Sequence, residues 1–513
     1  MLFLLIALVV SCINGLDTLS WGMNKEGSRY QYSSINKNNV DSLVVKWSTL
    51  LCGSVVASPS VVGDVLYVSD FGGCFTALNK NNGSIIYQKN LTSDYGLLDK
   101  AISRNTPTYS NGMIVIPMSA RWGFLEYSMG IWLLTVNASN GDLKWKVLVS
   151  SYNRSVLTGS PTIDNGKIYI GLTSTEEAEQ LLAGLQGRQY TCCGFGGRML
   201  SYSLSTGSKL WDTPMIPDEL TGVGKYSGAG IWSSGPSILG DYIFVSTGNL
   251  YNQSQESYDC YALNPTNSSC VPRSVLYDSV VKLNKNTGEI VASFRASETD
   301  VWNAACYLAG YIPGCPVYKG LDADFGNAPM LTEYENKTYV ALGQKSGIFW
   351  LLNSDDLSVV WKKMVGPSGG GGGFQYGSSV NDNNQIFGAS ANTDRTLHTT
   401  INGEVINFGS WVRLNMDGKI KWETPSPTND TLRGPLTTTN NVVFATTDSG
   451  TFCALSAITG EILWKYNTGV LSVSGPTVDN RVIYWGSGPV INFVQNISPY
   501  PCKLYAFELK RDD

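Results

Sequence analysis

The chain has 513 residues, of which 15% are charged, and a formal net charge of −5. With no basic run or basic amphipathic helix, this composition gives no case for a nucleic-acid partner. A single histidine excludes His-rich zinc sites and most nucleophilic schemes that need an imidazole beside the nucleophile.

The first element is an apolar run over residues 1–15, followed by small and polar residues. This pattern predicts a secretory signal peptide, and its run of roughly ten apolar residues is too short for a membrane span. We therefore expect a secreted, extracellular protein over residues 16–513 with no membrane span. Removing Cys12 with the signal leaves an even number of cysteines, which agrees with an oxidising compartment.

Cysteine spacing suggests three local disulfides, Cys260–Cys270, Cys306–Cys315 and one between the adjacent Cys192 and Cys193. Four other cysteines then remain to pair: Cys52, Cys74, Cys453 and Cys502. Nine Asn-x-Ser/Thr sequons predict a glycoprotein. They lie at Asn82, Asn90, Asn137, Asn153, Asn252, Asn267, Asn336, Asn429 and Asn496.

A short segment of the type Ser/Gly-Pro-x-Val/Ile, followed by a turn and an apolar strand, recurs eight times. Its copies begin at Ser58, Thr106, Ser160, Gly235, Ala328, Gly377, Gly434 and Gly475. Most copies lead to a Thr/Asn-Gly turn with an aromatic residue four positions after the glycine, as in Gly207 and Trp211. One copy departs from this, because Ala292 stands where the tryptophan is expected after Gly288.

Each unit contains short strands between turns and no long helical period, which predicts an all-β protein. Eight units are too many for a sandwich, and radial closure protects their edges, so we expect a single eight-bladed β-propeller. The stretch Trp21–Trp47 and the strand Lys503–Leu509 are expected to close the ring, and the recurring tryptophan to dock one blade on the next. Disulfide-clipped loop insertions are expected near residues 177–195, 251–273 and 302–317.

Three polar residues lie at strand ends in successive blades. Glu176 and Asn249 each end an apolar strand, and Asp324 precedes the next repeat. Neighbouring blades begin together at a propeller axis, so residues at equivalent ends can converge. Carboxylate and amide oxygens suit a hard cation such as Ca²⁺. Glu177 is an immediate alternative to Glu176, and each residue alone is also an ordinary turn former.

The repeats and these three segments, in this order, resemble the eight-bladed dehydrogenases that use pyrroloquinoline quinone (PQQ). The similarity is closest to the polyvinyl-alcohol-dehydrogenase-like branch and spans about residues 18–510. The resemblance implies that Glu176, Asn249 and Asp324 bind Ca²⁺. It also implies that Asp324 acts as the general base, taking the proton of an alcohol while hydride passes to the quinone.

The resemblance implies four cofactor contacts as well. Trp232, at the end of Gly228–Trp232, would form the flat floor under the quinone. Lys345 would lie beside the quinone oxygens, Arg104 would pair with a cofactor carboxylate, and Thr158 would contact a carboxylate.

Several positions depart from the family pattern. Ala323 replaces the tryptophan before the catalytic aspartate, and the insertion after Glu176 separates it from the strand that it normally adjoins. The adjacent Cys192 and Cys193 are either a cap on the cofactor or a structural clip near the channel mouth.

Two functions therefore stay open. The first is a secreted quinoprotein that oxidises a small alcohol or polyol and passes electrons to an external acceptor. The second is a non-catalytic extracellular propeller that binds carbohydrate or protein through its clipped insertions.

Overall fold

The computed structural model describes residues 17, 19–97, 101–119, 130–233, 235–264, 267–488 and 501–510. The predicted signal peptide and the sequon at Asn496 lie outside these residues. The described part is mostly β-strand, with two α-helices, α1 (Glu176–Leu185) and α2 (Gln255–Leu263). Four short 3-10 helices cover Val40–Ser42, Asp218–Leu220, Ser268–Cys270 and Ala304–Leu308. None of the described helices is long and apolar enough to cross a membrane.

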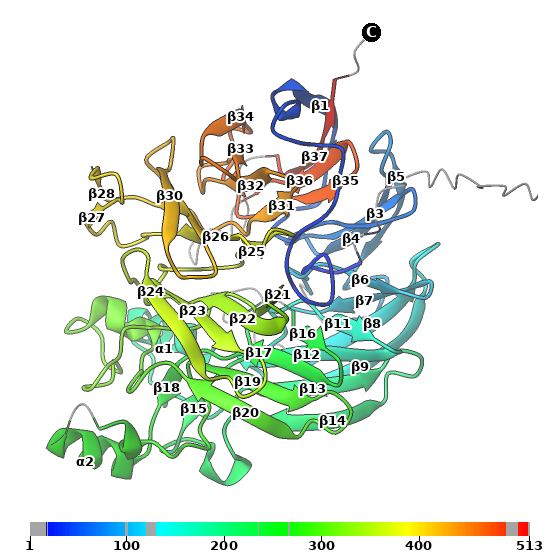
Figure 1. The fold of residues 1–513 in the computed structure, drawn as a ribbon. Coiled ribbons are helices and arrows are strands. Elements are labelled where there is room, and N and C mark those ends of the chain that lie inside the picture. The colour runs from blue at the N-terminus through cyan, green and yellow to red at the C-terminus, as the bar shows by residue number, and fades with distance from the viewer. Residues whose placement is uncertain are drawn as a thin grey trace, which may run out of the picture.

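Eight antiparallel sheets, each built on four strands, make up the described ring, which confirms the predicted eight-bladed propeller (Figure 1). The first four blades are β2 (Ser60–Val62), β3 (Val65–Ser69), β4 (Cys74–Asn79) and β5 (Ile85–Asn90); β6 (Thr108–Ser110), β7 (Met113–Pro117), β8 (Ile131–Asn137) and β9 (Leu143–Ser150); β11 (Thr162–Asp164), β12 (Lys167–Ser174), β13 (Arg198–Ser203) and β14 (Lys209–Pro214); and β16 (Ser237–Leu239), β17 (Tyr242–Ser246), β19 (Ser279–Asn284) and β20 (Ile290–Arg295). A short extra strand, β10 (Ser155–Val156), pairs with the end of β12.

The other four blades continue the same order. They are β21 (Met330–Tyr334), β22 (Lys337–Gly343), β23 (Ile348–Asn353) and β24 (Val359–Met364); β25 (Ser379–Val380), β26 (Ile386–Ser390), β29 (Ser410–Leu414) and β30 (Ile420–Pro425); β31 (Thr437–Thr439), β32 (Val442–Thr446), β33 (Thr451–Ser456) and β34 (Ile462–Asn467); and β35 (Thr477–Asp479), β36 (Val482–Gly486), β37 (Lys503–Leu509) and β1 (Leu43–Leu50). Two small ribbons pair β15 (Ser227–Gly228) with β18 (Leu250–Asn252), and β27 (His398–Thr399) with β28 (Val405–Ile406).

The eighth blade takes its outermost strand from the other end of the chain. Strand β1 pairs antiparallel with β37, from Leu43 opposite Leu509 to Leu50 opposite Lys503. In Figure 1 these two strands lie side by side, one blue and one red. The expected closing role of the strand Lys503–Leu509 is confirmed.

The recurring tryptophan docks one blade on the next at six of the eight described junctions, as predicted. The Trp47 indole N–H donates to the Lys80 carbonyl at 3.0 Å, and a Cβ at Gly83 would lie 2.5 Å from the Trp47 ring. Glycine is therefore required at this turn, where it also has φ of 73°. The same indole-to-carbonyl bond joins Trp145 to Leu204, Trp211 to Lys285, Trp361 to Met416, Trp422 to Ala457 and Trp464 to Leu43.

A second set of hydrogen bonds links the blades through their first strands. In six of the eight described junctions, a hydroxyl at the start of the first strand donates to a proline carbonyl of the following blade. The pairs are Ser60 to Pro107, Thr108 to Pro161, Thr162 to Pro236, Ser237 to Pro329, Thr437 to Pro476 and Thr477 to Pro59. The Ser/Gly-Pro segment of the repeat thus fixes where each blade begins around the axis.

The blade with Ala292 in place of tryptophan has a compensating change in its neighbour. Leu357 occupies the turn position that Gly83 holds in the first blade, and its N–H donates to the Asn353 carbonyl in the same way. The Leu357 side chain is 1% exposed and packs in the same apolar cluster as Ala292. The space left by the small Ala292 on one blade is therefore filled by the large Leu357 on the next.

Local cysteine spacing gave the correct pairs, since Cys192–Cys193, Cys260–Cys270 and Cys306–Cys315 are bonded. Cys52 bonds to Cys74 in the first blade. The Cys453 thiol is buried and belongs to none of these bonds.

We predict that Ala292→Trp and Leu357→Gly compensate each other. Ala292→Trp alone overpacks the junction and should lower the free energy of unfolding by about 1–3 kcal/mol. Leu357→Gly alone opens a cavity and should lower it by about 2–4 kcal/mol. The double variant restores the junction found in the other blades, so urea denaturation should show a smaller loss than the sum. Additive losses would contradict this account.

We also predict a pH effect from Asp70, whose carboxylate lies within 4.8 Å of the sulfur atoms of Cys52 and Cys74. Burial raises the pKa of Asp70 from 3.8 to about 6, although the N–H groups of Cys74 and Gly72 oppose this. The folded state holds the Asp70 proton more tightly than the unfolded state does. The protonated carboxyl therefore contributes its full stabilisation below about pH 4, and this contribution is lost as the pH rises through about 6. Relative to Asp70→Asn, the free energy of unfolding should fall by roughly 2–3 kcal/mol between pH 4 and pH 7. A difference that does not change with pH would refute the assignment.

Candidate active site

The residues predicted for the site lie in loops at one end of the ring. The first and second strands of each blade are antiparallel, so the loop before the first and the loop after the second meet at the same end. Four of the residues precede first strands: Arg104, Thr158, Trp232 and Asp324. Asn249 and Lys345 follow the second strands β17 and β22, and Glu176 follows β12.

Three of these residues form one buried cluster. The Lys345 ammonium lies 2.8 Å from Asp324 Oδ2, and the backbone N–H of Asn249 donates to Asp324 Oδ1. All three residues are almost entirely buried. The ring therefore brings together an amide, a carboxylate and an ammonium from two neighbouring blades.

Trp232 completes the cluster as an aromatic surface. The Lys345 Nζ lies 5.3 Å from the centre of the Trp232 ring, within the range of a cation–π interaction. Two glycines give the indole its room, because a Cβ at Gly248 would lie 2.9 Å from Nε1 and one at Gly326 would lie 3.4 Å from the ring edge. The indole N–H has no hydrogen-bond partner among the described residues.

Glu176 lies in a different network. Its carboxylate accepts hydrogen bonds from the hydroxyls of Tyr152 (2.5 Å) and Tyr190 (3.0 Å), and from the N–H groups of Gly194 (2.9 Å) and Phe195 (2.8 Å). The role of Glu176 as a cation ligand stays a prediction.

The neighbouring carboxylate, Glu177, interacts with the cluster. Burial raises the pKa of Glu177 to about 7, while the Lys345 charge opposes the shift and the Asp324 charge adds to it. The structure thus brings Glu177, the alternative named from the sequence, towards Asp324 and Lys345. The reason is local: helix α1 begins at Glu176, so successive side chains point in different directions.

Three further acids in the cluster were not identified from the sequence. Asp322 Oδ1 lies 2.8 Å from Lys345 Nζ, and burial raises the pKa of Asp322 well above its usual value. Asp300 accepts the N–H groups of Asp322 and Ala323, and burial raises its pKa to about 6. Burial, followed by the charge of Asp300, raises the pKa of Asp278 well above its usual value. The sequence offered a hint only for Asp322, which stands two positions before Asp324.

This cluster contains more negative than positive charge. Burial alone would lower the pKa of Lys345, but the charges of Asp322 and Asp324 raise it well above the ordinary value. The Lys345 ammonium contacts Asp322 and Asp324 and interacts with the charge of Glu177. Glu177, Asp278, Asp300 and Asp322 hold their protons more tightly than in water because their charges are poorly solvated. A divalent cation would offset this excess.

The donor atoms fit such a cation. The side-chain oxygen of Asn249 is buried and has no hydrogen-bond partner among the described residues. Its amide nitrogen, in contrast, donates to the carbonyls of Leu250 (3.1 Å) and Trp302 (2.9 Å), which fixes the orientation of the oxygen. Amide and carboxylate oxygens are the ligands that Ca²⁺ takes in proteins. Asn249, Asp324 and Glu177 are the residues that would hold it.

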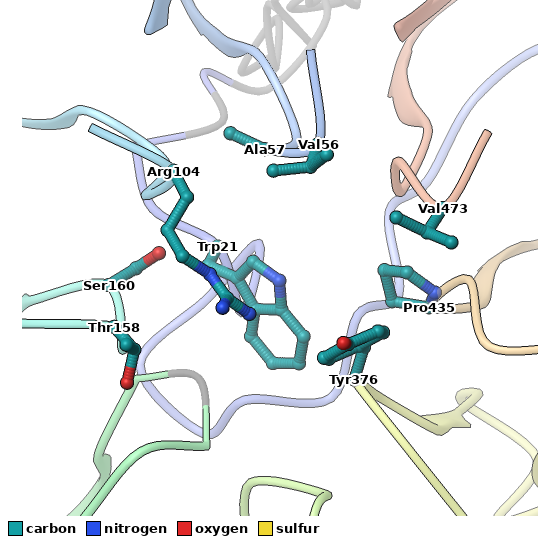
Figure 2. A pocket seen from close by; sticks show the side chains of 9 residues that line it. All are labelled: Trp21, Val56, Ala57, Arg104, Thr158, Ser160, Tyr376, Pro435 and Val473. Carbon is teal, nitrogen blue, oxygen red and sulfur yellow. The ribbon is translucent and has the colours of Figure 1, made fainter. Parts of the chain in front are cut away.

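A pocket near the ring axis contains the remaining two predicted residues. It holds about 420 Å³ of space including its open mouth, and Arg104, Thr158, Trp21 and Tyr376 are among its lining residues. Figure 2 shows these side chains around the same space. The Arg104 guanidinium lies 5.7 Å from the centre of the Tyr376 ring, and no carboxylate of the described residues pairs with it. Arg104 can therefore receive an anionic group of a ligand.

Thr158 connects this pocket to the cluster. Its hydroxyl donates to the Trp232 carbonyl at 3.1 Å. The predicted cofactor residues are thus linked in sequence: Arg104 and Thr158 line the pocket, Thr158 bonds to Trp232, and Lys345 lies over the Trp232 ring. Together with Asp324 they offer a site for an anionic group, a flat aromatic ring and a carboxylate that can accept a proton.

Comparisons with known proteins agree with this architecture. A family model described as "Outer membrane protein assembly factor BamB" matches residues 44–304 and 407–490. The polyvinylalcohol dehydrogenase of a Pseudomonas species is 25% identical over 518 residues, which cover 93% of this chain and 74% of the relative. The polyvinylalcohol dehydrogenase of Sphingopyxis sp. (strain 113P3) is 23% identical over 509 residues, covering 91% and 72%.

A solved structure shows the same fold. The quinohemoprotein alcohol dehydrogenase ADHIIG of Pseudomonas putida HK5 superposes with a TM-score of 0.69 at 17% identity. The superposition covers 96% of this chain and 80% of that chain.

We predict that Lys345 offsets the buried carboxylates. In the presence of a chelator, Lys345→Met leaves Asp322 and Asp324 without their cation and should lower the free energy of unfolding by about 3–5 kcal/mol. Adding Asp322→Asn should recover part of this loss, because one of the two charges is removed. Urea denaturation of both variants measures the effect. A loss below about 1 kcal/mol in Lys345→Met, the range of an exposed ion pair, would contradict the role of Lys345.

Proposed function

Because the chain belongs to the PQQ-dependent, quinoprotein alcohol dehydrogenase-like family of eight-bladed propellers, we propose that it oxidises an alcohol or polyol with PQQ and Ca²⁺. The observation that carries this proposal is the buried cluster around Asp324. A carboxylate, an unpartnered amide oxygen and an ammonium lie together beside one face of an indole. This combination suits proton removal from a bound hydroxyl.

Asp324 is the residue that would accept the alcohol proton. Its Oδ2 is held by Lys345 and its Oδ1 by the Asn249 N–H, so the carboxylate is fixed in place before substrate binds. The buried surroundings exclude water, which strengthens the interactions of the developing charges. PQQ, when bound, supplies the electron acceptor for the hydride of the alcohol carbon.

The other residues would bind and orient the cofactor and the cation. Arg104 offers a guanidinium to a cofactor carboxylate, and Trp232 offers a flat ring on which a planar cofactor can stack. Asn249, Asp324 and Glu177 would hold Ca²⁺, which polarises a bound oxygen as a Lewis acid. Electrons would leave to an external acceptor, and the predicted signal peptide supports a secreted enzyme.

We predict that Asp324→Asn and Asn249→Ala each abolish dye-linked alcohol oxidation. Loss of a general base lowers turnover by roughly 10²–10⁴-fold, which sets the expected effect of Asp324→Asn. Asn249→Ala removes the unpartnered amide oxygen, so it should weaken Ca²⁺ binding and with it the Ca²⁺-dependent rise in melting temperature on PQQ addition.

Two controls make this test specific. Asp41→Asn, at an exposed aspartate far from the cluster in the sequence, should leave oxidation and the melting shift unchanged. Removing Ca²⁺ with a chelator should eliminate the melting shift in the parent protein, and added Ca²⁺ should restore it. Full activity in Asp324→Asn, or PQQ binding that ignores Ca²⁺, would reject the proposal.

A further inference from the structure

A groove opens at the junction between the fourth and fifth blades, where Ala292 replaces the recurring tryptophan. Its walls are β20, the strands β23 and β24, and the segment that follows the 3-10 helix Ser268–Cys270. In Figure 1, β20 and β24 are the outer strands of these two neighbouring blades. Phe294 lies two positions after Ala292, on the same face of β20, and lines the groove. The volume of about 760 Å³ lies within the roughly 300–1,000 Å³ of small-molecule sites.

One wall of the groove is aromatic. The centres of the Trp350 and Phe294 rings lie 5.1 Å apart, and Trp350 is 4% exposed. The Trp350 N–H donates to Gln344 Oε1 at 3.2 Å, which fixes the indole in the wall. Leu276 adds a buried apolar side chain. A planar or apolar part of a ligand can pack on this wall.

Cationic side chains border the same groove. Arg273, Arg295 and Lys362 line it, together with a single acid, Glu298. None of the three cations forms an ion pair with a carboxylate of the described residues. Positive charge is therefore in excess here, although the whole chain has a net charge of −5. This excess would attract an anion.

Hydrogen bonds and ring contacts hold two of these cations in place. Lys362 lies opposite Trp350 in the β23–β24 pairing, and its Nζ is 5.5 Å from the centre of the Trp350 ring. The Arg295 guanidinium donates to the carbonyls of Val271 (3.3 Å) and Pro272 (2.7 Å), which are neutral acceptors. Both cations thus lie beside the groove without a carboxylate that balances their charge.

The aromatic wall and the cations together select one class of ligand. An inorganic anion would leave the aromatic wall unused, and a neutral aromatic compound would leave the cations unbalanced. An aryl carboxylate or aryl sulfonate satisfies both features. Its oxygens accept charge-assisted hydrogen bonds from guanidinium and ammonium groups, while its ring packs on Trp350 and Phe294. We propose that this groove is a binding site for such an aromatic anion.

The proposed site is separate from the candidate active site, although one residue connects the two. Gln344 Nε2 donates at 3.3 Å to the hydroxyl of Ser297, which lines the groove, and Gln344 directly precedes Lys345. Neither Asp324 nor Arg104 lines the groove. Binding of the aromatic anion therefore does not rest on the proposed function, and it can be measured without PQQ and Ca²⁺.

The first test measures the binding of 2-naphthoate to the full chain by isothermal titration calorimetry, in a chelating buffer without PQQ. Lys362→Gln and Arg273→Gln change exposed side chains, so both variants should fold. Each should weaken binding roughly threefold, the size of one exposed ion pair. The double variant should weaken it roughly tenfold, because the two effects add.

Lys363→Gln is the matched control. Lys363 is the next residue of β24, so its side chain points to the opposite face of the strand and does not line the groove. Its variant removes the same charge and should bind 2-naphthoate like the parent. An equal loss of affinity in Lys363→Gln and Lys362→Gln would indicate a general attraction between charges and would overturn the proposal.

Two further probes test the class of ligand. 2-Naphthamide keeps the rings without the charge and should bind roughly tenfold more weakly than 2-naphthoate. Acetate keeps the carboxylate without the rings and should also bind roughly tenfold more weakly, or less than that, because it buries little apolar surface. Affinity equal to that of 2-naphthoate for either probe contradicts an aromatic-anion site.

Arg104→Gln distinguishes the groove from the pocket near the ring axis, which also holds a guanidinium and aromatic side chains. Affinity that is lost in Arg104→Gln but kept in the double variant would assign the anion to that pocket and overturn the groove. Loss confined to the Lys362→Gln and Arg273→Gln variants supports the groove. This result holds whether or not the protein loaded with PQQ and Ca²⁺ oxidises an alcohol.

Discussion

Contact between neighbouring blades is the interaction on which this structure depends. An indole from one blade lies against a glycine turn of the next and donates its N–H to a carbonyl there. Nearer the axis, a hydroxyl of one blade donates to a proline carbonyl of the following blade. The first contact excludes a side chain at the turn, and the second fixes the start of the first strand. Together they set the position of each blade, and so of the loops that meet at the axis.

The fixed loop positions hold the charged groups of the site in an arrangement that is unfavourable in free energy. Five carboxyl groups and one ammonium come together where water is largely excluded, and most of the pKa values move against ionisation. A flexible scaffold would relax by exposing them. The ring cannot, because each acid lies in a segment, either a loop or the start of helix α1, whose two ends are anchored in strands. Rigidity of the blades therefore maintains an electrostatic arrangement that favours a bound cation.

The fold could be predicted because its determinants are local and repeated. A Pro segment, a Gly turn and a Trp four residues later recur in the sequence, and the proline and tryptophan contacts each recur at six of the eight described junctions. Ala292 and Leu357 both depart visibly from the repeat, but their packing against each other could not be predicted, because the two lie in different repeats. Three disulfides followed from spacing of at most ten residues.

Much less of the site could be predicted from the residues alone. Asn249, Asp324, Lys345 and Trp232 do come together, and the resemblance had identified all four. Glu176 and Glu177 could not be told apart, because the start of helix α1 decides which of the two side chains interacts with Lys345 and Asp324. Asp278 and Asp300 belong to no motif. Their role comes from loops between strands, which approach the cluster only after the blades have packed.

Closure by β1 has a consequence for how the chain matures. Residues 43–50 pair with residues 503–509. The first blade-forming strand to leave a ribosome or a translocation channel therefore has no pairing partner until nearly the last strand has emerged. Seven blades can form in succession during that time, yet the eighth remains open at its edge. An unpaired edge strand is prone to pairing with other chains. The protein is therefore most exposed to misassembly just before β37 is available, when a chaperone that shields β1 would help it most.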